Sequence, residues 1–435
     1  MRTSISIAAA FLLLSGAHAQ TPTDEASEAA LTDMTEECTN YNYAPVVNAA
    51  SSFPTLWTPV SSVPTTDPGY AKFIAMNASI PNIAPKGTLG VPDNTINTYP
   101  SSDPDCWWTE SQCTTPKTAG VNPDIASVPE PRTLGYGFDD GPNCSHNAFY
   151  DYLESKNQKA TLYYIGSSVM IWPLQAQRAV ADGHEICVRE CLFSDIYLGL
   201  YGTLASDDTW SHRSMTAFNN EQAFGELWYT MQAIKLVTGV TPTCWRPPLG
   251  DVDDRIRYIA QQLGLETIIW KYDTFDWQAN DAAITPPVTP QDVQNNYNTF
   301  INDATSGDFN TIGAIVLTHE LNNFTMQTAI DNYEKLVAAF DHIMPVGVAL
   351  NKTTPYVETN YTQSNFEEYV AARAGGSNST SGSSGSSATG SNSGSPSGTG
   401  SKAQTTGTGS SAGVTIRASG LTLVLALVGA LFIAQ

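Results

Sequence analysis

The chain is poor in basic residues. Lysine and arginine together number 20, against 42 aspartates and glutamates, and the formal net charge is −22. Nucleic acids and anionic membrane surfaces attract positively charged proteins, so this balance argues against both as partners. It does not argue against a neutral polymer, which carries no charge to attract or repel.

Cysteine pairs of the zinc-finger type are also absent. None of the seven cysteines forms a Cys-x-x-Cys pair, so a structural cysteine metal site is not expected. In an oxidising compartment these cysteines would instead form disulfides, and an odd number leaves one over. The seven are Cys38, Cys106, Cys113, Cys144, Cys187, Cys191 and Cys244.

Both ends of the chain carry a hydrophobic run that is short for a membrane span, which needs about 20 residues. Residues 1–19 combine one early arginine, an apolar run and Ala-His-Ala, which predicts a secretory signal peptide cleaved before Gln20. Residues 412–435 end in an apolar run after a short spacer, which predicts a propeptide exchanged for a glycosylphosphatidylinositol (GPI) anchor at Ser410 or Ser411. We therefore expect a secreted protein that is GPI-anchored to the plasma membrane; a tail-anchored transmembrane protein is the alternative.

Two further segments lack the apolar periodicity from which a core is built. Residues 356–411 are dominated over most of their length by serine, threonine and glycine, which predicts a linker that forms a disordered stalk. Residues 20–130 are rich in proline, serine, threonine and asparagine, which predicts an irregular N-terminal extension stapled to the main domain by cysteines. The main domain is then 131–355.

Strand and helix patterns alternate within the main domain. Apolar runs predict strands at 133–138, 160–166, 184–188, 243–246, 267–270 and 313–318. Helical patterns lie at 147–156, 173–182, 220–237, 253–263, 290–301 and 326–343. Repeated βα units imply a parallel sheet, and about seven of them predict an α/β fold, a distorted barrel of about seven strands.

Two adjacent acids end the first strand. Asp139 and Asp140 precede Gly-Pro, which stops strand pairing, so both are expected at the rim where α/β barrels keep their chemistry. One carboxylate with imidazoles suits a divalent metal that keeps a position open for water, and a second carboxylate can deprotonate that water. Taken singly, these groups also fit solvated turn acids, core histidines and a surface ion pair. The other polar or aromatic groups at strand ends are His212, Arg246, Asp273, Asp276, Trp277 and His319.

In this order the motifs resemble one family. From about residue 132 to 350 the chain is similar to the polysaccharide deacetylases (NodB homology, carbohydrate esterase family 4), and most to fungal GPI-anchored chitin deacetylases. Phe-Asp-Asp-Gly-Pro at 138–142 resembles the first motif, which implies Asp139 as the catalytic base and Asp140 as a metal ligand. His212 resembles the second histidine of the His-x-x-x-His metal motif.

The later motifs imply roles for residues around the metal. Arg246 would orient the base, and Leu249, where tyrosine is common, would donate its backbone N–H to the oxyanion. Asp273 and Asp276 resemble the motif that supports His319, the implied general acid. The residues that would line the substrate pocket are Trp277 and Leu317.

The resemblance implies a reaction and its setting. A divalent metal, zinc or cobalt, would assist hydrolysis of the N-acetyl groups of chitin or chitooligosaccharides at the cell wall, giving chitosan and acetate. Two alternatives stay open: a deacetylase of another polysaccharide such as acetylated xylan, and a non-catalytic wall-binding protein that has lost its metal.

The second motif is interrupted. Residues 189–207 intervene, and Asp208 stands where the first histidine is expected, four residues before His212. Removing this insert and placing histidine for Asp208 restores the family pattern and also removes Cys191, leaving six cysteines for disulfides. A retained intron would explain both observations. The alternative is a genuine insertion loop, in which Asp208 serves as an oxygen ligand at the same spacing.

Overall fold

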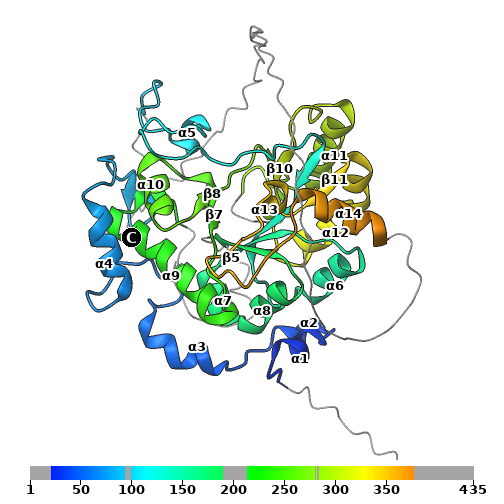
Figure 1. The fold of residues 1–435 in the computed structure, drawn as a ribbon, viewed down its shortest axis with the longest axis horizontal. Helices are drawn as coiled ribbons and strands as arrows, with labels where there is room; N and C mark the ends of the chain where they lie inside the picture. The colour runs from blue at the N-terminus through cyan, green and yellow to red at the C-terminus, as the bar shows by residue number, and fades with distance from the viewer. Residues whose placement is uncertain (1–20, 94–98, 190–212, 280, 282–283, 377–435) are drawn as a thin grey trace, which may run out of the picture. The chain divides into compact units, whose positions relative to one another are not determined.

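Parallel strands, most of them followed by a helix, form the centre of the fold (Figure 1). The computed structural model describes residues 21–93, 99–189, 213–279, 281 and 284–376. Neighbouring strands of the larger sheet are all parallel. Their order is β4 (Gly137–Gly141), β5 (Thr161–Ile165), β6 (Glu185–Arg189), β7 (Cys244–Arg246) and β8 (Glu266–Thr267).

A second parallel sheet contributes four strands. Their order is β11 (His342–Met344), β3 (Thr133–Gly135), β10 (Ala314–Leu317) and β9 (Tyr272–Asp273). A parallel bridge between Asp139 and His319 connects the end of β4 to the residues that follow β10. The predicted parallel α/β fold is thus confirmed, whereas closure into one barrel of about seven strands stays a prediction.

Helices lie around the larger sheet in Figure 1. The principal ones are α6 (Asn147–Ser155), α7 (Gly166–Ile171), α8 (Pro173–Ala181), α9 (Asn220–Thr238), α10 (Asp254–Gln262), α11 (Pro290–Ser306) and α12 (Asn323–Ala339). Helix α9 begins where the Asn219 side chain accepts the N–H of Gln222, and it ends at Gly239, whose φ of 80° closes the last turn. All residues of β4, β5 and β6 are buried, as expected for a parallel sheet covered on both faces.

The predicted helix at 326–343 is wrong at both ends. Helix α12 begins three residues earlier, because the Asn322 side chain accepts the N–H groups of Phe324 and Thr325. It ends at Ala339, and His342–Met344 instead forms β11 beside β3. The apolar residues of this short edge strand continue the helical spacing, which explains the error.

The segment 20–130 contains more regular structure than its composition predicts. It forms α1 (Glu25–Ala29), α2 (Met34–Glu37), α3 (Ala44–Ala49), α4 (Pro68–Asn77), α5 (Trp108–Ser111) and the small antiparallel pair β1 (Gly87–Thr88) and β2 (Val91–Pro92). Helix α1 packs against α8, while α3 and α4 pack against α9. A buried hydrogen bond of 2.6 Å from Val60 N–H to Glu226 Oε1 fastens this extension to α9.

Three disulfides link the six described cysteines. They are Cys38–Cys144, Cys106–Cys113 and Cys187–Cys244. The first joins the N-terminal segment to the loop after β4, so the expected stapling of the extension is present. Cys191 lies outside the described residues.

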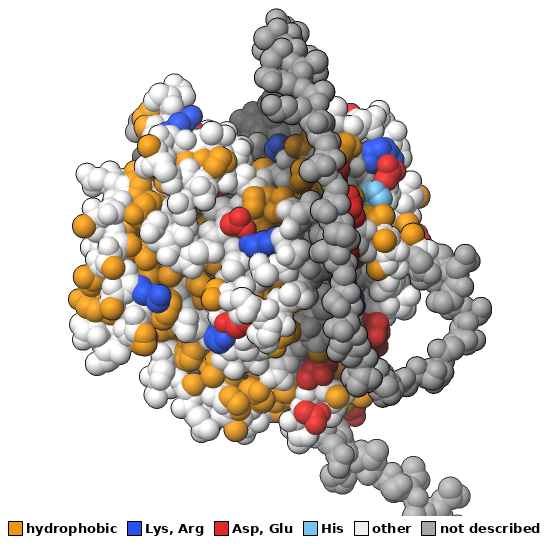
Figure 2. Space-filling view, in the orientation of Figure 1, with side chains coloured by type: hydrophobic (Ala, Val, Ile, Leu, Met, Phe, Trp, Pro, Cys, Tyr) orange, Lys and Arg blue, Asp and Glu red, His pale blue; other side chains and the backbone are white. Residues whose placement is uncertain are grey.

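Regular structure continues past the predicted domain boundary at residue 355. After α13 (Val346–Ala349), Tyr356 is buried, and α14 (Phe366–Gly376) lies within the segment expected to be a linker. The predicted signal peptide, most of the stalk and the propeptide lie outside the described residues. None of the helices that are described is long and apolar enough to span a membrane. On the face in Figure 2, acidic side chains stand in small separate groups, and several of these groups lie beside a lysine or arginine.

Candidate active site

A β-bulge separates the two aspartates at the end of β4. Asp139 pairs with Tyr163 and Gly141 with Tyr164 on β5, so Asp140 has no opposite residue on this strand. Asp140 has a φ of 74°, a left-handed conformation that is uncommon for a residue with a side chain. Such outliers cluster at functional sites, so this conformation marks Asp140 as a candidate site residue.

Asp139 is fully buried and held by an arginine. Its Oδ1 accepts a hydrogen bond of 2.7 Å from Nη1 of Arg246, which is also fully buried at the end of β7. The Arg246 guanidinium lies 3.9 Å from the ring centroid of Tyr163, and its Nη2 donates to the Tyr163 hydroxyl at 3.2 Å. The pair is therefore an interior ion pair and not a surface one.

A second arginine contacts both aspartates. Arg189, the last residue of β6, has its Nε 3.0 Å from Oδ1 of Asp140 and forms an ion pair through Nη1 with Oδ2 of Asp139. Its side chain is buried. Burial raises the pKa of Asp140, and the positive charge of Arg189 counteracts this effect. The guanidinium thus lies between the two carboxylates from which the predicted metal site was to be built.

His319 lies on the other side of Asp139 and is held by Asp276. Its ring Nδ1 is 2.6 Å from Asp276 Oδ1, and its backbone N–H donates to Asp276 Oδ2 at 3.0 Å. Burial alone would lower the pKa of His319, but the Asp276 carboxylate outweighs it, and the pKa is raised to about 9. His319 is therefore protonated at neutral pH and can donate a proton.

Asp273 and Asp276 differ in what they contact. Asp273 Oδ1 accepts the N–H of Phe275 at 2.7 Å, so Asp276 is the carboxylate that contacts the His319 ring. Burial raises the pKa of Asp273 to about 7. Trp277 lies beside His319 with ring centroids 6.5 Å apart, and Leu317 is buried at the end of β10, opposite Asp273. These predicted residues are thus brought together around His319.

The turn after β7 presents Leu249. This residue has φ 54° and ψ 10° within the 3-10 turn Pro248–Gly250, and its side chain is partly exposed. The following Gly250 has a φ of 69° and lies against the ring of Trp108. A Cβ on Gly250 would stand 2.1 Å from Trp108 Cζ3, so the close approach requires glycine. The turn that carries the predicted oxyanion donor is therefore fixed by packing.

Glu320 is a buried site residue that sequence analysis missed. It follows His319 directly, and its carboxylate accepts from Asn143 N–H at 3.0 Å and from the Tyr150 hydroxyl at 2.8 Å. His146 Nδ1 lies 2.9 Å from the same carboxylate. Through these contacts Glu320 ties the loop after Asp140 to the end of β10. A charged residue three positions after the last residue of an apolar strand was the available signal.

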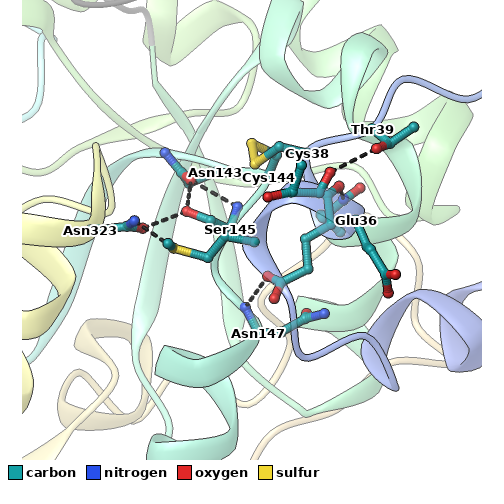
Figure 3. The surroundings of a disulfide bond; sticks show 12 residues. Glu36, Cys38, Thr39, Asn143, Cys144, Ser145, Asn147 and Asn323 are labelled. Carbon is teal, nitrogen blue, oxygen red and sulfur yellow. Dashed lines mark hydrogen bonds between the residues drawn. A yellow bond between two sulfur atoms is a disulfide. The ribbon is translucent and has the colours of Figure 1, made fainter. Parts of the chain in front are cut away.

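The Cys38–Cys144 disulfide lies beside this loop (Figure 3). Ser145 Oγ donates to Asn143 Oδ1 at 2.9 Å and lies 2.6 Å from Asn323 Oδ1. Asn143 Nδ2 also donates to the carbonyl of Leu321 at 2.7 Å. The loop that follows the two aspartates is consequently held by side-chain hydrogen bonds as well as by a covalent bond.

The described residues do not fit a divalent cation as they are arranged. A cation needs several electron-pair donors, but Asp140 faces the positively charged Arg189. Within the described ranges, the clusters of three possible ligands are Asp103, Cys106, Cys113 and Glu185, Cys187, Cys244, and their cysteines are in disulfides. The predicted ligands His212 and Asp208 lie outside the described residues.

Residues 126–268 match the polysaccharide deacetylase family, and the similarity to single relatives covers much more of the chain. The chain belongs to this family. It is 49% identical over 365 residues to chitin deacetylase 2 of Cryptococcus neoformans var. grubii serotype A, which covers 82% of this chain and 75% of the relative. It is 42% identical over 337 residues to the chitin deacetylase of Amylomyces rouxii, covering 75% and 73%. A solved chitin deacetylase from Colletotrichum lindemuthianum aligns at 18% identity and a TM-score of 0.43, over 56% of this chain and 97% of that one.

Proposed function

We propose that this protein hydrolyses the N-acetyl groups of chitin or chitooligosaccharides to give chitosan and acetate. One observation carries the proposal: Asp139, a buried carboxylate, is paired through the backbone bridge after β10 with His319, an imidazole whose pKa is raised to about 9. Hydrolysis of an amide needs such a pair, because a proton must leave water and another must reach the amine. The 49% identity to a chitin deacetylase supports chitin as the polymer.

In the proposed reaction Asp139 is the base. Arg246 fixes one carboxylate oxygen, so that the carboxylate keeps its orientation while it removes a proton from water. The hydroxide oxygen bonds to the acetyl carbon, and the carbonyl oxygen becomes an oxyanion. The proposed donor to that oxyanion is the backbone N–H of Leu249, which stands in the turn after β7.

His319 is the proposed acid. Its proton passes to the amide nitrogen as the C–N bond breaks, which releases acetate and leaves a free amine on the sugar. Asp276 holds the imidazole and keeps it protonated until this step, and Asp273 is proposed to support the same motif. Trp277 and Leu317 are proposed to line the pocket around the acetyl group.

The family is divalent metal dependent, and we propose zinc or cobalt as the cation. Its proposed ligands are Asp140 with His212, and Asp208 in the chain as written. Since Arg189 contacts Asp140, no step of the reaction above is assigned to the cation.

We also propose that the protein acts outside the cell, GPI-anchored to the plasma membrane and facing the wall. The sequence patterns at 1–19 and 412–435 support this location. Three disulfides among the described cysteines support an oxidising compartment.

A second candidate function is a wall-binding protein without catalysis, favoured by the contact of Arg189 with both acids. Acetate release distinguishes the two. Chitin oligomers incubated with the protein and added zinc or cobalt should release acetate if it is a deacetylase. A protein that only binds would retain the oligomers and release no acetate. Acetate release from acetylated xylan but not from chitin oligomers would mean that xylan is the substrate.

A further inference from the structure

We propose that Arg189 competes with the divalent cation for the two aspartates. In the chain as written, the guanidinium holds the site in a metal-free state, and a cation enters only by displacing it. This inference rests on the proposed function, which takes Asp140 as a ligand of the cation. Arg189 would thus control how readily the site binds a cation, a role that no sequence motif predicted.

The position of Arg189 is set by the sheet. It is the last residue of β6 and pairs with Ile165 on β5 and with Arg246 on β7. Asp139 lies in β4, the strand of the same sheet on the other side of β5. Adjacent parallel strands present their carboxyl ends at one edge, so the Arg189 side chain reaches the two acids without leaving the interior.

The contacts use the groups a cation would need. Arg189 Nε lies 3.0 Å from Oδ1 of Asp140, and Nη1 pairs with Oδ2 of Asp139. The other oxygen of Asp139, Oδ1, accepts from Arg246 at 2.7 Å. The Arg189 guanidinium therefore already occupies the position beside the Asp140 carboxylate that a bound cation would need.

Charge makes the two occupants exclude one another. Two carboxylates facing Arg189 and Arg246 have compensating charges, and all four side chains are buried. A divalent cation added beside Arg189 would place four positive charges against two negative ones. Coulomb repulsion is strong where water is excluded, so the cation and the Arg189 guanidinium cannot both stay.

The sequence explains why an arginine stands there. Arg189 is the first residue of the 189–207 insert, and without the insert β6 would run directly into the metal motif. The family pattern expects a metal-binding histidine at the end of this strand. With the insert, a positively charged arginine stands there instead. Arg189 thus occupies the edge from which a metal ligand would otherwise project.

The first test measures metal on the full chain and on Arg189→Gln, which removes the charge while retaining a polar side chain. We expect Arg189→Gln to bind one equivalent of zinc or cobalt at a concentration on the order of tenfold or more lower than the unaltered chain requires. Calorimetric titration and metal content by mass spectrometry are the readouts. The gain should vanish in Arg189→Gln combined with Asp140→Asn.

A matched control is Arg178→Gln. Arg178 lies on α8, away from the acids of β4. It is also a buried arginine that pairs with two carboxylates, those of Asp151 and Asp182. It should leave the zinc titration unchanged. An equal gain in Arg178→Gln would mean that the effect is a general consequence of losing a buried arginine, and would overturn the proposal.

A second measurement needs no Arg189 variant and so holds even if that variant fails to fold. The unaltered chain should gain little thermal stability from zinc at concentrations that saturate ordinary sites, since a ligand stabilises only where it binds. If the unaltered chain binds one equivalent of zinc tightly, and Asp140→Asn abolishes this binding, the proposal is overturned. The two failures are distinguishable: a metal-loaded Arg189→Gln that releases no acetate contradicts the proposed function, while a tightly loaded unaltered chain contradicts the competition.

Discussion

At the scale of residues, Asp139 carries the largest share of the proposed chemistry. Its carboxylate is buried, fixed by Arg246 on one oxygen and in contact with Arg189 on the other. A base must be held but must also reach water, so the contact with Arg189 has to open before catalysis. The contact between Arg189 and Asp139 therefore affects both the reaction and the binding of the metal.

Asp139→Asn should abolish turnover, with kcat lowered on the order of a hundredfold to ten-thousandfold, because an amide cannot accept the water proton. Acetate release from chitin oligomers measures the effect. The matched control is Asp124→Asn, which removes another buried carboxylate paired with an arginine, Arg257, outside the site. Asp124→Asn should lose stability but keep kcat, and retained activity in Asp139→Asn would remove Asp139 from the role of base.

Asp276→Asn should lower the pKa of His319, since the Asp276 carboxylate makes the largest contribution to raising it to about 9 against the effect of burial. A raised histidine pKa stabilises the folded state fully below the unfolded value of about 6.5, and this stabilisation is lost as pH rises through about 9. In the variant, the alkaline limb of the kcat–pH profile should move to lower pH while KM changes less.

The comparison variant for this test is Asp273→Asn. Because Asp273 contacts the N–H of Phe275 and not the His319 ring, its loss should shift the alkaline limb less. An unchanged limb in Asp276→Asn, or an equal shift in both variants, would contradict the assignment of Asp276 as the residue that positions His319.

At the scale of elements, local sequence patterns predicted the long helices but missed a short strand that forms only by pairing with another strand. Helix α9 has an apolar face and caps at both ends within its own sequence, so its limits could be predicted. Strand β11 could not, because three residues gain their conformation from pairing with β3. Motifs likewise located Asp139, Arg246 and His319. The contacts of Arg189 and Glu320 join strands far apart in sequence, where no local pattern applies.

The turn after β7 allows a test at this scale. Gly250→Ala should reduce the free energy of unfolding by about 1–3 kcal/mol, because a Cβ strains the left-handed conformation and would clash with Trp108. Urea unfolding measures the loss. Gly120→Ala is the control, since Gly120 has a φ of 82° but nothing within 4 Å of the added Cβ. A Gly250→Ala loss no larger than the control would show that the Trp108 contact does not fix the turn.

At the scale of the whole molecule, the open question is whether the natural protein contains residues 189–207. If they form a genuine loop, the protein should yield a tryptic peptide that runs from Glu190 to Arg213, and Arg189 faces the acids. If it is a retained intron, that peptide should be missing, and a peptide joining Val188 to a histidine in the place of Asp208 should appear. Peptide mass spectrometry of the protein from its natural source measures both, and finding the 190–213 peptide would contradict the intron hypothesis.

Acetate release from chitin oligomers at increasing cobalt concentration, compared between the full chain and Arg189→Gln, tests both deacetylation and the competition between Arg189 and the cation. We expect both proteins to release acetate at saturating cobalt, and we expect Arg189→Gln to reach half of its maximal rate at a lower cobalt concentration. Oligomers that are bound but never deacetylated by either chain, at any cobalt concentration, would contradict the proposed deacetylation.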